Sequence, residues 1–498
     1  MRAVILSSLL SLSPAILVAT ARESGANWQA RQNHALEARQ DPAGVADDAA
    51  VSTSLPASNP VAAPTPVNSG LVIAPPATTP VGSVSAPGVA PTTYSFSLQA
   101  TNPTAVPLSM ITAAQSSFPT RPLASTATAG AKPSFIPGAP DLPDASLLLP
   151  INYPVMDAPP PTDSPEVQQW KQDVANSGIT IPDFAPTIPG GCAFNQAIAT
   201  DPNRCWWTCT GCTRDADITQ CPKPMQWGLT YDDGPGFYTS NLLQYLDEKK
   251  LKSTFFVVGS RAIQFPRILQ TQYLGEHQIA VHTWSHTPLT TQTNDQIIAE
   301  LGWTKKIIKD ALGVTPNMMR PPFGDIDDRV RAISIAMGLT PVIWTRTSPV
   351  STFDTDDFNI HNGVTPVSKV LQNWQNILSS AQGLDHGFIV LEHDLFQESV
   401  EVATGYILPD ALAHNPPFSI QPVVQCLGRS MGDAYIETNN NKTNPPPGTS
   451  GGSNAQDGDS DSGFAGRQFE LQMNPTTLGG MIIGISGFAV GFLAMLRV

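Results

Sequence analysis

The chain has 498 residues, of which 48 are prolines and only 14% are charged. This composition indicates that much of the chain is not ordinary globular sequence, so the folded core must be smaller than the length suggests. The formal net charge of -14 argues against nucleic acid and other polyanions as partners, because binding them requires clustered lysine and arginine. A neutral or weakly cationic substrate is compatible with this charge.

The first segment is typical of a secretory signal. Arg2 precedes an apolar run of signal-peptide length, and small residues at positions 19–21 form a cleavage site. We therefore expect residues 1–21 to be a removed signal peptide. The alternative is a membrane-spanning anchor, which is disfavoured because the run is short and interrupted by serine and proline.

Residues 22–149 are rich in alanine, proline, serine and threonine without a periodic pattern, for example PATTPVGSVSAPGVAPTT. Proline keeps such a chain extended, and its hydroxyl groups are expected to carry O-linked sugars. We expect this segment to be a stalk through a cell wall, with no packed core.

Residues 150–436 are expected to form one catalytic domain, because strand-like and helix-like segments alternate there. The runs WGLTYDD, STFFVVG, QIAVHT, TPVIWT and GFIVLEHD are short and rich in β-branched or aromatic residues. Amphipathic stretches at Asn294–Leu312 and 366–381 fall between them. This alternation indicates a parallel α/β sheet or barrel, in which reacting residues lie at strand ends.

The cysteines are even in number, and behind a signal peptide an even count indicates disulfides. They are Cys192, Cys205, Cys209, Cys212, Cys221 and Cys426. The run CWWTCTGC could instead form a zinc knuckle, but export and the lack of a nearby histidine as fourth ligand argue against this. The sequence leaves the pairing open. A bond between Cys192 and Cys426, which we take as the candidate pair, would tie the two ends of the domain together.

Two adjacent carboxylates, Asp232 and Asp233, follow the run WGLTY and precede Gly234 and Pro235. Adjacent residues can point in different directions, so one carboxylate could bind a metal ion while its neighbour acts as a base. For an isolated DDGP sequence, a turn with two solvated acids is the commoner interpretation.

The second motif is HTWSH, in which His282 and His286 lie four residues apart. If this segment turns helically, the spacing places both imidazoles on one face, as metal-binding pairs require. An aspartate would complete a set of two histidines and one carboxylate, which leaves coordination positions open for water and substrate.

Three further motifs place polar residues at strand ends. In MMRPPFGD, Arg320 precedes two prolines that stiffen the turn. Its guanidinium could hold a carboxylate base in place and keep it charged; the alternative is an ordinary surface ion pair. FDTDDF spans residues 353–358, and FIVLEHD delivers Leu391, His393 and Asp394. Histidine is the usual general acid near neutral pH, although a lone histidine after an apolar strand is more often structural.

The C-terminal part is again of low complexity. Residues 437–472 are expected to be a tether and contain an N-glycosylation sequon at Asn441. Small residues at 460–466, a polar spacer and the apolar run 478–496 are typical of a glycosylphosphatidylinositol (GPI) signal. We expect residues 473–498 to be removed when this lipid anchor is attached; a retained membrane helix is the alternative. In both cases the enzyme would face outward from a membrane.

In this order, TYDDGP, HTWSH, RPPFGD, DTDDF and LEHD resemble the five motifs of the polysaccharide deacetylase family, carbohydrate esterase family 4. Each motif alone is weak, but five in order across residues 226–394 are specific. The secreted, stalked and anchored layout is similar to the fungal chitin deacetylases. The resemblance implies an α/β fold, a distorted (β/α) barrel with fewer than eight repeats, flanked by disordered segments.

The resemblance also implies a site for one divalent metal ion made by Asp233, His282 and His286. Zinc and cobalt both suit nitrogen and oxygen ligands of this type. By the same likeness, Asp232 is the general base that contacts the substrate, and His393 is the general acid. Amide hydrolysis requires a polarised carbonyl, an activated water and a proton for the amine, and these three groups supply them.

Four further roles follow from the family. Arg320 would brace the base, and Asp357 would tune either the general acid or Arg320. The main-chain N–H of Phe323 would bind the oxyanion, and Leu391 would line a small pocket for the acetyl methyl group. Both Phe323 and Phe358 are departures, because the family commonly has tyrosine and tryptophan there.

The motif DTDD allows a shift of one residue, so the choice among Asp354, Asp356 and Asp357 stays open. The implied reaction is hydrolysis of N-acetyl groups in chitin or chitin oligomers of the cell wall, giving chitosan and acetate. Peptidoglycan or xylan could be the acetylated polymer instead. A non-catalytic chitin-binding wall protein is the alternative outside the enzymes.

Overall fold

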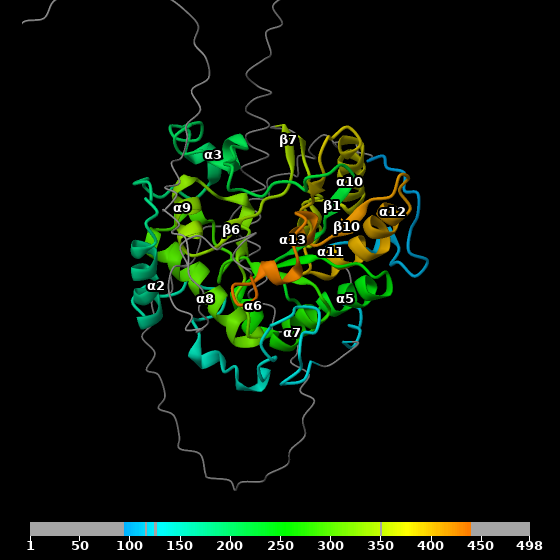
Figure 1. Ribbon diagram of the computed structural model, residues 1–498. Helices are drawn as coiled ribbons and strands as arrows, with labels where there is room; N and C mark the ends of the chain where they lie inside the picture. Colours follow the sequence, from blue (N-terminus) through cyan, green and yellow to red (C-terminus); the bar gives the residue numbers. More distant parts are fainter. Residues whose placement is uncertain (1–93, 115–116, 124–126, 349–350, 440–498) are drawn as a thin grey trace, which may run out of the picture. The chain divides into compact units, whose positions relative to one another are not determined.

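A computed structural model describes residues 94–114, 117–123, 127–348 and 351–439 (Figure 1). The expected signal peptide, the GPI signal and Asn441 lie outside these residues. Within the described ranges, no helix combines the length and the apolar character needed to cross a membrane.

Two parallel sheets form the centre of the domain. One has the order β2-β3-β4-β5-β6 and the other the order β10-β1-β9. The strands are β1 (Gln226–Gly228), β2 (Thr230–Asp232), β3 (Thr254–Val257), β4 (Gln278–Val281), β5 (Met318–Met319), β6 (Thr340–Pro341), β9 (Phe388–Ile389) and β10 (Ser419–Gln421). Most fall within or beside the strand-like runs of the sequence, and β5 lies in the motif MMRPPFGD, but β10 was not predicted.

The two sheets join into a closed arrangement of strands. Only Leu229 separates β1 from β2. Beyond β9, His393 pairs with Asp232 of β2 through a parallel bridge, and beyond β6 the main-chain N–H of Thr345 donates to the carbonyl of Ile389. These contacts connect β9 to both edges of the larger sheet. The expected fold class, a distorted (β/α) barrel with fewer than eight repeats, is confirmed.

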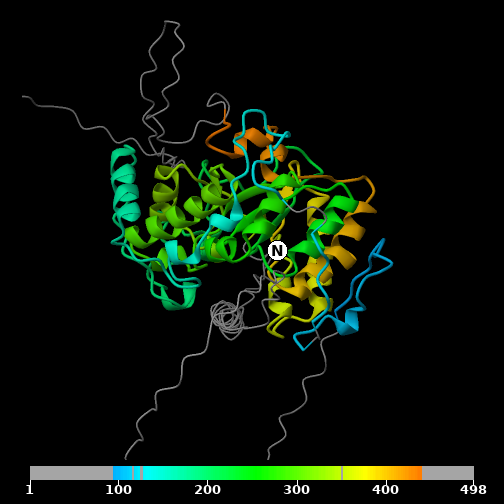
Figure 2. The ribbon, with the colours of Figure 1, turned by 90° about the horizontal axis from the view of Figure 1, so that it is seen from below.

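Helices follow the strands and lie around them, as Figure 1 shows, with the view from below in Figure 2. They are α5 (Thr239–Glu248), α6 (Gly259–Gln264), α7 (Pro266–Leu274), α8 (Asn294–Leu312), α9 (Asp328–Ala336), α10 (Val367–Ala381), α11 (Gln397–Val402) and α12 (Leu408–Leu412). A single π-helical turn, Ala403–Ile407, joins α11 to α12. Other elements are α2 (Pro165–Asn176), α3 (Gly191–Phe194), α4 (Trp207–Thr210), α13 (Val423–Cys426) and the antiparallel pair β7 (Arg346–Ser348) and β8 (Ser351–Thr352).

The helix α8 illustrates how local sequence sets these boundaries. Thr293 caps its start in a reciprocal capping box with Gln296, and Gly313 ends it at φ +80°. A left-handed residue at that position favours glycine. The expected helix Asn294–Leu312 is confirmed at both ends.

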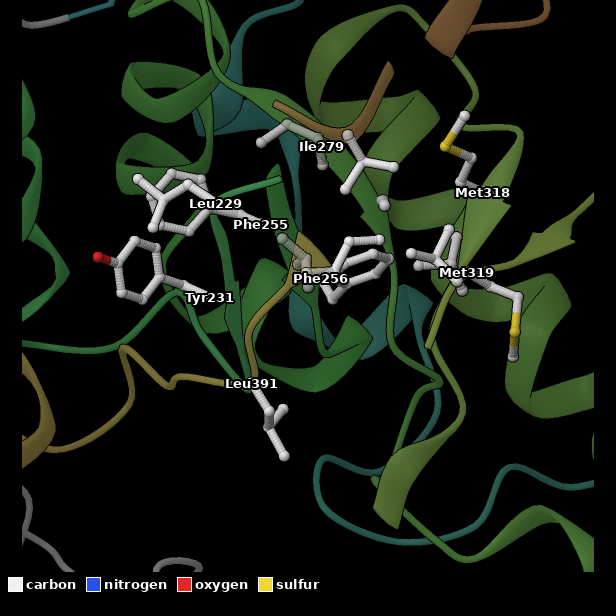
Figure 3. Close-up of a cluster of buried hydrophobic side chains, with 14 of the residues drawn as sticks. Leu229, Tyr231, Phe255, Phe256, Ile279, Met318, Met319 and Leu391 are labelled. Atoms are coloured by element: carbon white, nitrogen blue, oxygen red, sulfur yellow. The ribbon is translucent and has the colours of Figure 1, made fainter. Parts of the chain in front are cut away.

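Apolar side chains of the strands fill the core, as Figure 3 shows. Leu229, Phe255, Phe256 and Ile279 are each at most 1% exposed. Burying a side chain of this size stabilises the fold by about 1.5–3 kcal/mol. The packed strands therefore give a rigid base for the polar residues that follow them.

The expected stalk is wrong for its described part. Ile111, Ile136 and Leu142 are at most 2% exposed and belong to the domain's hydrophobic core. The main-chain N–H of Asn102 also donates to the carbonyl of Gly405 at 2.8 Å. These residues pack without regular secondary structure, so their burial leaves no period in the sequence.

All six cysteines form disulfides, as the even count predicts. The pairs are Cys192–Cys209, Cys205–Cys212 and Cys221–Cys426. The candidate pair Cys192–Cys426 is therefore wrong. Cys192 lies on α3, which packs against α4; Cys426 lies on α13 beside β1, close to Cys221. The zinc-knuckle alternative is also excluded, because its three sulfurs are in disulfides.

Replacing Cys221 and Cys426 together by serine is expected to destabilise the fold by about 5 kcal/mol, because the bond closes a long loop in the unfolded chain. The two cysteines are 205 residues apart, whereas Cys205 and Cys212 are only 7 apart. The matched double serine variant of that short loop is expected to lose only about 2 kcal/mol. Denaturant unfolding measures both values, and equal losses would contradict this prediction.

Candidate active site

Polar residues from several strand ends surround one pocket. Its lining is Asp232, Asp233, His282, His286, Phe323, Trp344, Phe358, Leu391 and His393. All but Phe358 follow or end β2, β4, β5, β6 and β9, so the parallel strands bring their carboxyl ends to one place. The structure thus brings together residues that are up to 161 positions apart in the sequence.

The adjacent carboxylates of the first motif have different partners. Asp232 ends β2 and accepts a hydrogen bond from Arg320 Nη1 at 2.7 Å. Asp233 has a left-handed backbone, with φ +76°, and faces the two histidines. The following turn is held by Asp394, whose Oδ1 accepts from the main-chain N–H of Gly234 at 3.1 Å.

The turn after Asp233 needs glycine for a steric reason. A Cβ atom at Gly234 would lie 2.3 Å from Asp394 Oδ1. Asp394 also accepts from the hydroxyl of Thr239 at 2.7 Å. The sequence offered Asp394 only as the end of a strand motif, so its function in shaping the turn of the paired carboxylates was missed.

Three ligand atoms of the kind that bind metal ions converge on one side of the pocket. His282 Nε2 lies 3.2 Å and His286 Nε2 lies 3.1 Å from Asp233 Oδ1. All three atoms lie within 4.8 Å of one another. His282 Nδ1 lies 2.8 Å from the carbonyl of Arg320; donation to that oxygen leaves Nε2 with its lone pair.

The donor set fits a divalent metal ion. Asp233 is 4% exposed, and among the described residues no group donates a hydrogen bond to its Oδ1. A buried carboxylate oxygen without a donor is costly unless a cation lies beside it. Two imidazoles and one carboxylate are a recurring ligand set that leaves positions open.

The pKa shifts of Asp233 and His286 agree with their use as metal ligands. Burial opposes ionisation of Asp233, but the neighbouring His286 and His282 outweigh it and hold the pKa of the carboxyl well below its usual range. Burial lowers the pKa of His286, partly offset by Asp233. An ionised carboxylate and a neutral imidazole are the forms that bind metal ions.

The sequence suggested that HTWSH could form a helical turn with both imidazoles on one face. The loop between the two histidines is not helical. Thr283 and His286 have positive φ angles of 65° and 56°. The imidazoles nevertheless meet, with ring centroids 5.0 Å apart. The spacing of four residues therefore correctly predicted that His282 and His286 are neighbours, but the helical turn assumed for them is wrong.

Arg320 is fully buried, so the alternative of a surface ion pair is wrong. Its Nη1 donates to Asp232 Oδ1 at 2.7 Å and to the hydroxyl of Thr230 at 2.9 Å. Its guanidinium lies 4.1 Å from the ring centroid of Phe256. These contacts fix the orientation of the Asp232 carboxylate.

His393 forms a second pair across the pocket. Its Nδ1 lies 2.7 Å from Asp357 Oδ1, and its main-chain N–H donates to Asp357 Oδ2 at 2.9 Å. Burial disfavours the charged imidazole, but Asp357, together with Asp233 and Asp232, outweighs burial and raises the pKa of His393 to about 10. Among the three acids left open by DTDD, only Asp357 has these contacts; Asp354 and Asp356 bond to one another through a main-chain N–H.

Aromatic and aliphatic side chains form the walls. The ring of Phe323 lies 4.7 Å from that of His286, and the ring of Phe358 lies 5.2 Å from that of His393. Leu391 also lines the pocket. The two positions that depart from the family pattern are therefore both in the wall, where ring size affects the space for a ligand.

A model of the family described as polysaccharide deacetylase matches residues 219–342. The chain is 50% identical over 340 residues to chitin deacetylase 1 of Cryptococcus neoformans var. grubii, covering 68% of this chain and 71% of the relative. It is 44% identical over 207 residues to a chitin deacetylase of Amylomyces rouxii, covering 40% and 47% of the two chains. The solved chitin deacetylase of Colletotrichum lindemuthianum aligns at 24% identity with a TM-score of 0.39, over 44% of this chain and 95% of that one.

Proposed function

The chain belongs to the polysaccharide deacetylase family, and from this premise we propose that it hydrolyses the N-acetyl groups of N-acetylglucosamine residues in chitin, giving chitosan and acetate. One observation carries the proposal. The ligand set Asp233, His282 and His286 shares a pocket with two buried pairs, Asp232 with Arg320 and His393 with Asp357.

The proposed cofactor is one divalent ion, zinc or cobalt, held by Asp233, His282 and His286. When bound, such an ion polarises a carbonyl oxygen and lowers the pKa of water. Nitrogen and oxygen ligands suit both metals. The remaining chemistry comes from side chains of the chain itself.

Asp232 is the proposed general base. Its Oδ1 is occupied by Arg320 Nη1 at 2.7 Å, and the other oxygen, Oδ2, lies 3.8 Å from His282 Nε2. The free oxygen therefore borders the ligand set, where it can accept a proton from a water molecule attacking the acetyl carbon. Arg320 holds the carboxylate in that orientation.

His393 is the proposed general acid. An amine is a poor leaving group until it is protonated, and His393 Nε2 is the free nitrogen of an imidazole whose Nδ1 faces Asp357. Nε2 lies 4.0 Å from Asp233 Oδ2, so it borders the same space as the ligand set. It can donate its proton to the departing nitrogen.

Two wall residues complete the proposal. The main-chain N–H of Phe323 would donate to the developing oxyanion, a contact worth about 3–4 kcal/mol in enzymes of this kind. Leu391, which is 3% exposed, would contact the acetyl methyl group. Because both act on the acetyl group, neither identifies the polymer.

Asp357→Asn is expected to shift the alkaline limb of the pH profile to lower pH. Asp357 raises the pKa of His393, and the acid must be protonated to act, so activity is lost as pH rises through that pKa. Without the Asp357 carboxylate, the pKa of His393 is lower, so activity is lost at a lower pH. Acetate release by metal-loaded wild type and variant, measured across pH, tests this; an unchanged alkaline limb would contradict it.

The polymer is tested by product analysis on a soluble chitin derivative, acetylated xylan and peptidoglycan. Release of acetate from the chitin derivative at the highest kcat/KM supports the proposal. A preference for either other polymer would move the assignment to that substrate. Binding to chitin without acetate release from any of the three would favour the chitin-binding wall protein instead.

We also propose that the enzyme is exported and acts at the outer face of the plasma membrane and in the cell wall. Its three disulfides suit an oxidising compartment. Residues 1–21 and 473–498 would be removed as signal peptide and GPI signal, and Asn441 would carry a glycan. A shortened stalk, residues 22–93, would then precede the folded domain, and residues 437–472 would tether it.

A further inference from the structure

The loop that carries both histidines of the ligand set has an unfavourable backbone. Thr283 and His286 lie in the left-handed region, where a β-branched residue such as threonine is rarely found. Such conformations persist only when surrounding structure determines them. The loop must therefore be held by contacts from outside its own sequence.

One buried carboxylate from another element provides these contacts. Glu300 Oε2 accepts hydrogen bonds from the main-chain N–H groups of Trp284 and Ser285, each at 2.8 Å. The hydroxyl of Ser285 donates to the other carboxylate oxygen. Glu300 is 0% exposed. It thus binds the loop exactly between its two histidines, at the only two residues separating Thr283 from His286.

The position of Glu300 is itself well determined. It lies in the middle of the 19-residue helix α8, whose two ends are capped. Helix α6 packs closely against the same region, because a Cβ at Gly259 would lie 2.6 Å from the Trp284 ring and 2.8 Å from the hydroxyl of Thr304. The main-chain N–H of Ser260 also donates to the Trp284 carbonyl at 3.1 Å. The loop is thus held by contacts from both α8 and α6.

We propose that Glu300 is a positioning residue for the metal site, which holds the loop so that His282 and His286 meet Asp233. The proposal rests on the function proposed above, because it requires that these three residues bind a metal ion. Glu300 belongs neither to the ligand set nor to the residues that line the pocket. It contacts the loop through the main-chain N–H groups of Trp284 and Ser285 and through the hydroxyl of Ser285.

The chemistry of these contacts distinguishes three substitutions. Glu300→Ala leaves two buried N–H groups without their acceptor, and the loop is free to leave the strained conformation. Glu300→Gln keeps one carbonyl oxygen, which can accept from both N–H groups as Oε2 does now. Glu300→Asp keeps the charge, but its shorter side chain cannot reach the loop in the same geometry.

Metal affinity is the decisive measurement, made by titrating Zn²⁺ into the intact protein against a chromophoric chelator. Loss of an outer contact of this kind typically weakens metal binding about 10- to 100-fold. We expect that loss for Glu300→Ala and Glu300→Asp, and near wild-type affinity for Glu300→Gln. Thermal unfolding without metal shows which variants fold; if Glu300→Ala does not, Glu300→Asp gives the answer.

Asp410→Ala is the matched control. Asp410 is also 0% exposed and also accepts from a main-chain N–H, that of Gln99, and from Trp374 Nε1, but it does not contact the loop. We expect its Zn²⁺ affinity to equal that of the wild type even if its stability falls. An unchanged affinity in the folded Glu300 variants, or an equal loss in Asp410→Ala, would overturn the positioning role. Absence of Zn²⁺ binding by the wild type would instead contradict the proposed function.

Discussion

His286→Ala is expected to abolish metal binding and to reduce acetate release by at least about 10³-fold, because a bound metal ion supplies several kcal/mol of transition-state stabilisation and each 1.36 kcal/mol is tenfold in rate. The substitution removes one of the two imidazoles that, among the described residues, have Nε2 facing Asp233 Oδ1. Asp233 and His282 would remain, and two protein ligands rarely hold a catalytic metal ion.

The fold should tolerate this change. His286 lies in a loop and its side chain is 16% exposed, so its removal leaves no large cavity in the core. His386→Ala is a suitable control, because His386 contacts the carbonyl of Gly387 and does not line the pocket. Mass spectrometry measures the metal content. His286→Ala should lose both bound metal and acetate release, and His386→Ala should keep both. Activity in a metal-free His286→Ala protein would contradict the assigned ligand set.

Asp232→Asn is expected to reduce acetate release by about 10²–10⁴-fold, the usual contribution of a general base, while leaving metal bound. Its neighbour gives the matched comparison, since Asp233→Asn alters a ligand and should lose the metal as well. The structure separates the two carboxylates clearly. Asp232 pairs with Arg320 at 2.7 Å, whereas Asp233 faces His282 and His286.

The Asp232 variant has a structural cost that must be measured separately. Arg320 is 0% exposed, and an uncompensated buried charge is strongly destabilising. Thermal unfolding of the metal-loaded variant gives that cost, and kinetics below the transition give the catalytic loss. If Asp232→Asn lost metal while Asp233→Asn retained it, the roles of the two carboxylates would have to be exchanged.

Much of the fold could be predicted from the sequence, because its strands are short apolar runs and its helices have marked ends. The capping residues Thr293 and Gly313 gave α8 its limits. The segment around Ile111 and Ile136 could not be predicted in the same way. It packs on the domain without an α-helix or a strand, so burial left no periodic signal.

The candidate site was predicted because its residues stand in short motifs directly after strands. Its geometry was not. The choice of Asp357 over Asp354 depended on which carboxylate reaches His393, a distance that spacing alone cannot give. Glu300 was missed for a related reason. It is one acidic residue within an amphipathic helix, and only the fold shows that it binds the loop of His286.

The predicted disulfide pair was wrong because the order of residues in the sequence says little about which of them are neighbours in a barrel. Cys192 begins the folded cysteines and Cys426 ends them, which suggested a bond between the two ends. Cys221 precedes β1, and Cys426 lies on α13, which packs against β1. The fold therefore places these two cysteines beside each other. Cys192 has its partner within the next 17 residues.

We expect this pocket to remove acetyl groups from chitin only when a metal ion is bound. Acetate release from a soluble chitin derivative by the purified protein, before and after treatment with a chelator and again after adding Zn²⁺ or Co²⁺, tests it most directly. We predict release that the chelator removes and one of the metals restores. Release that persists in a protein free of metal, or none from a folded and metal-loaded protein, would contradict the account.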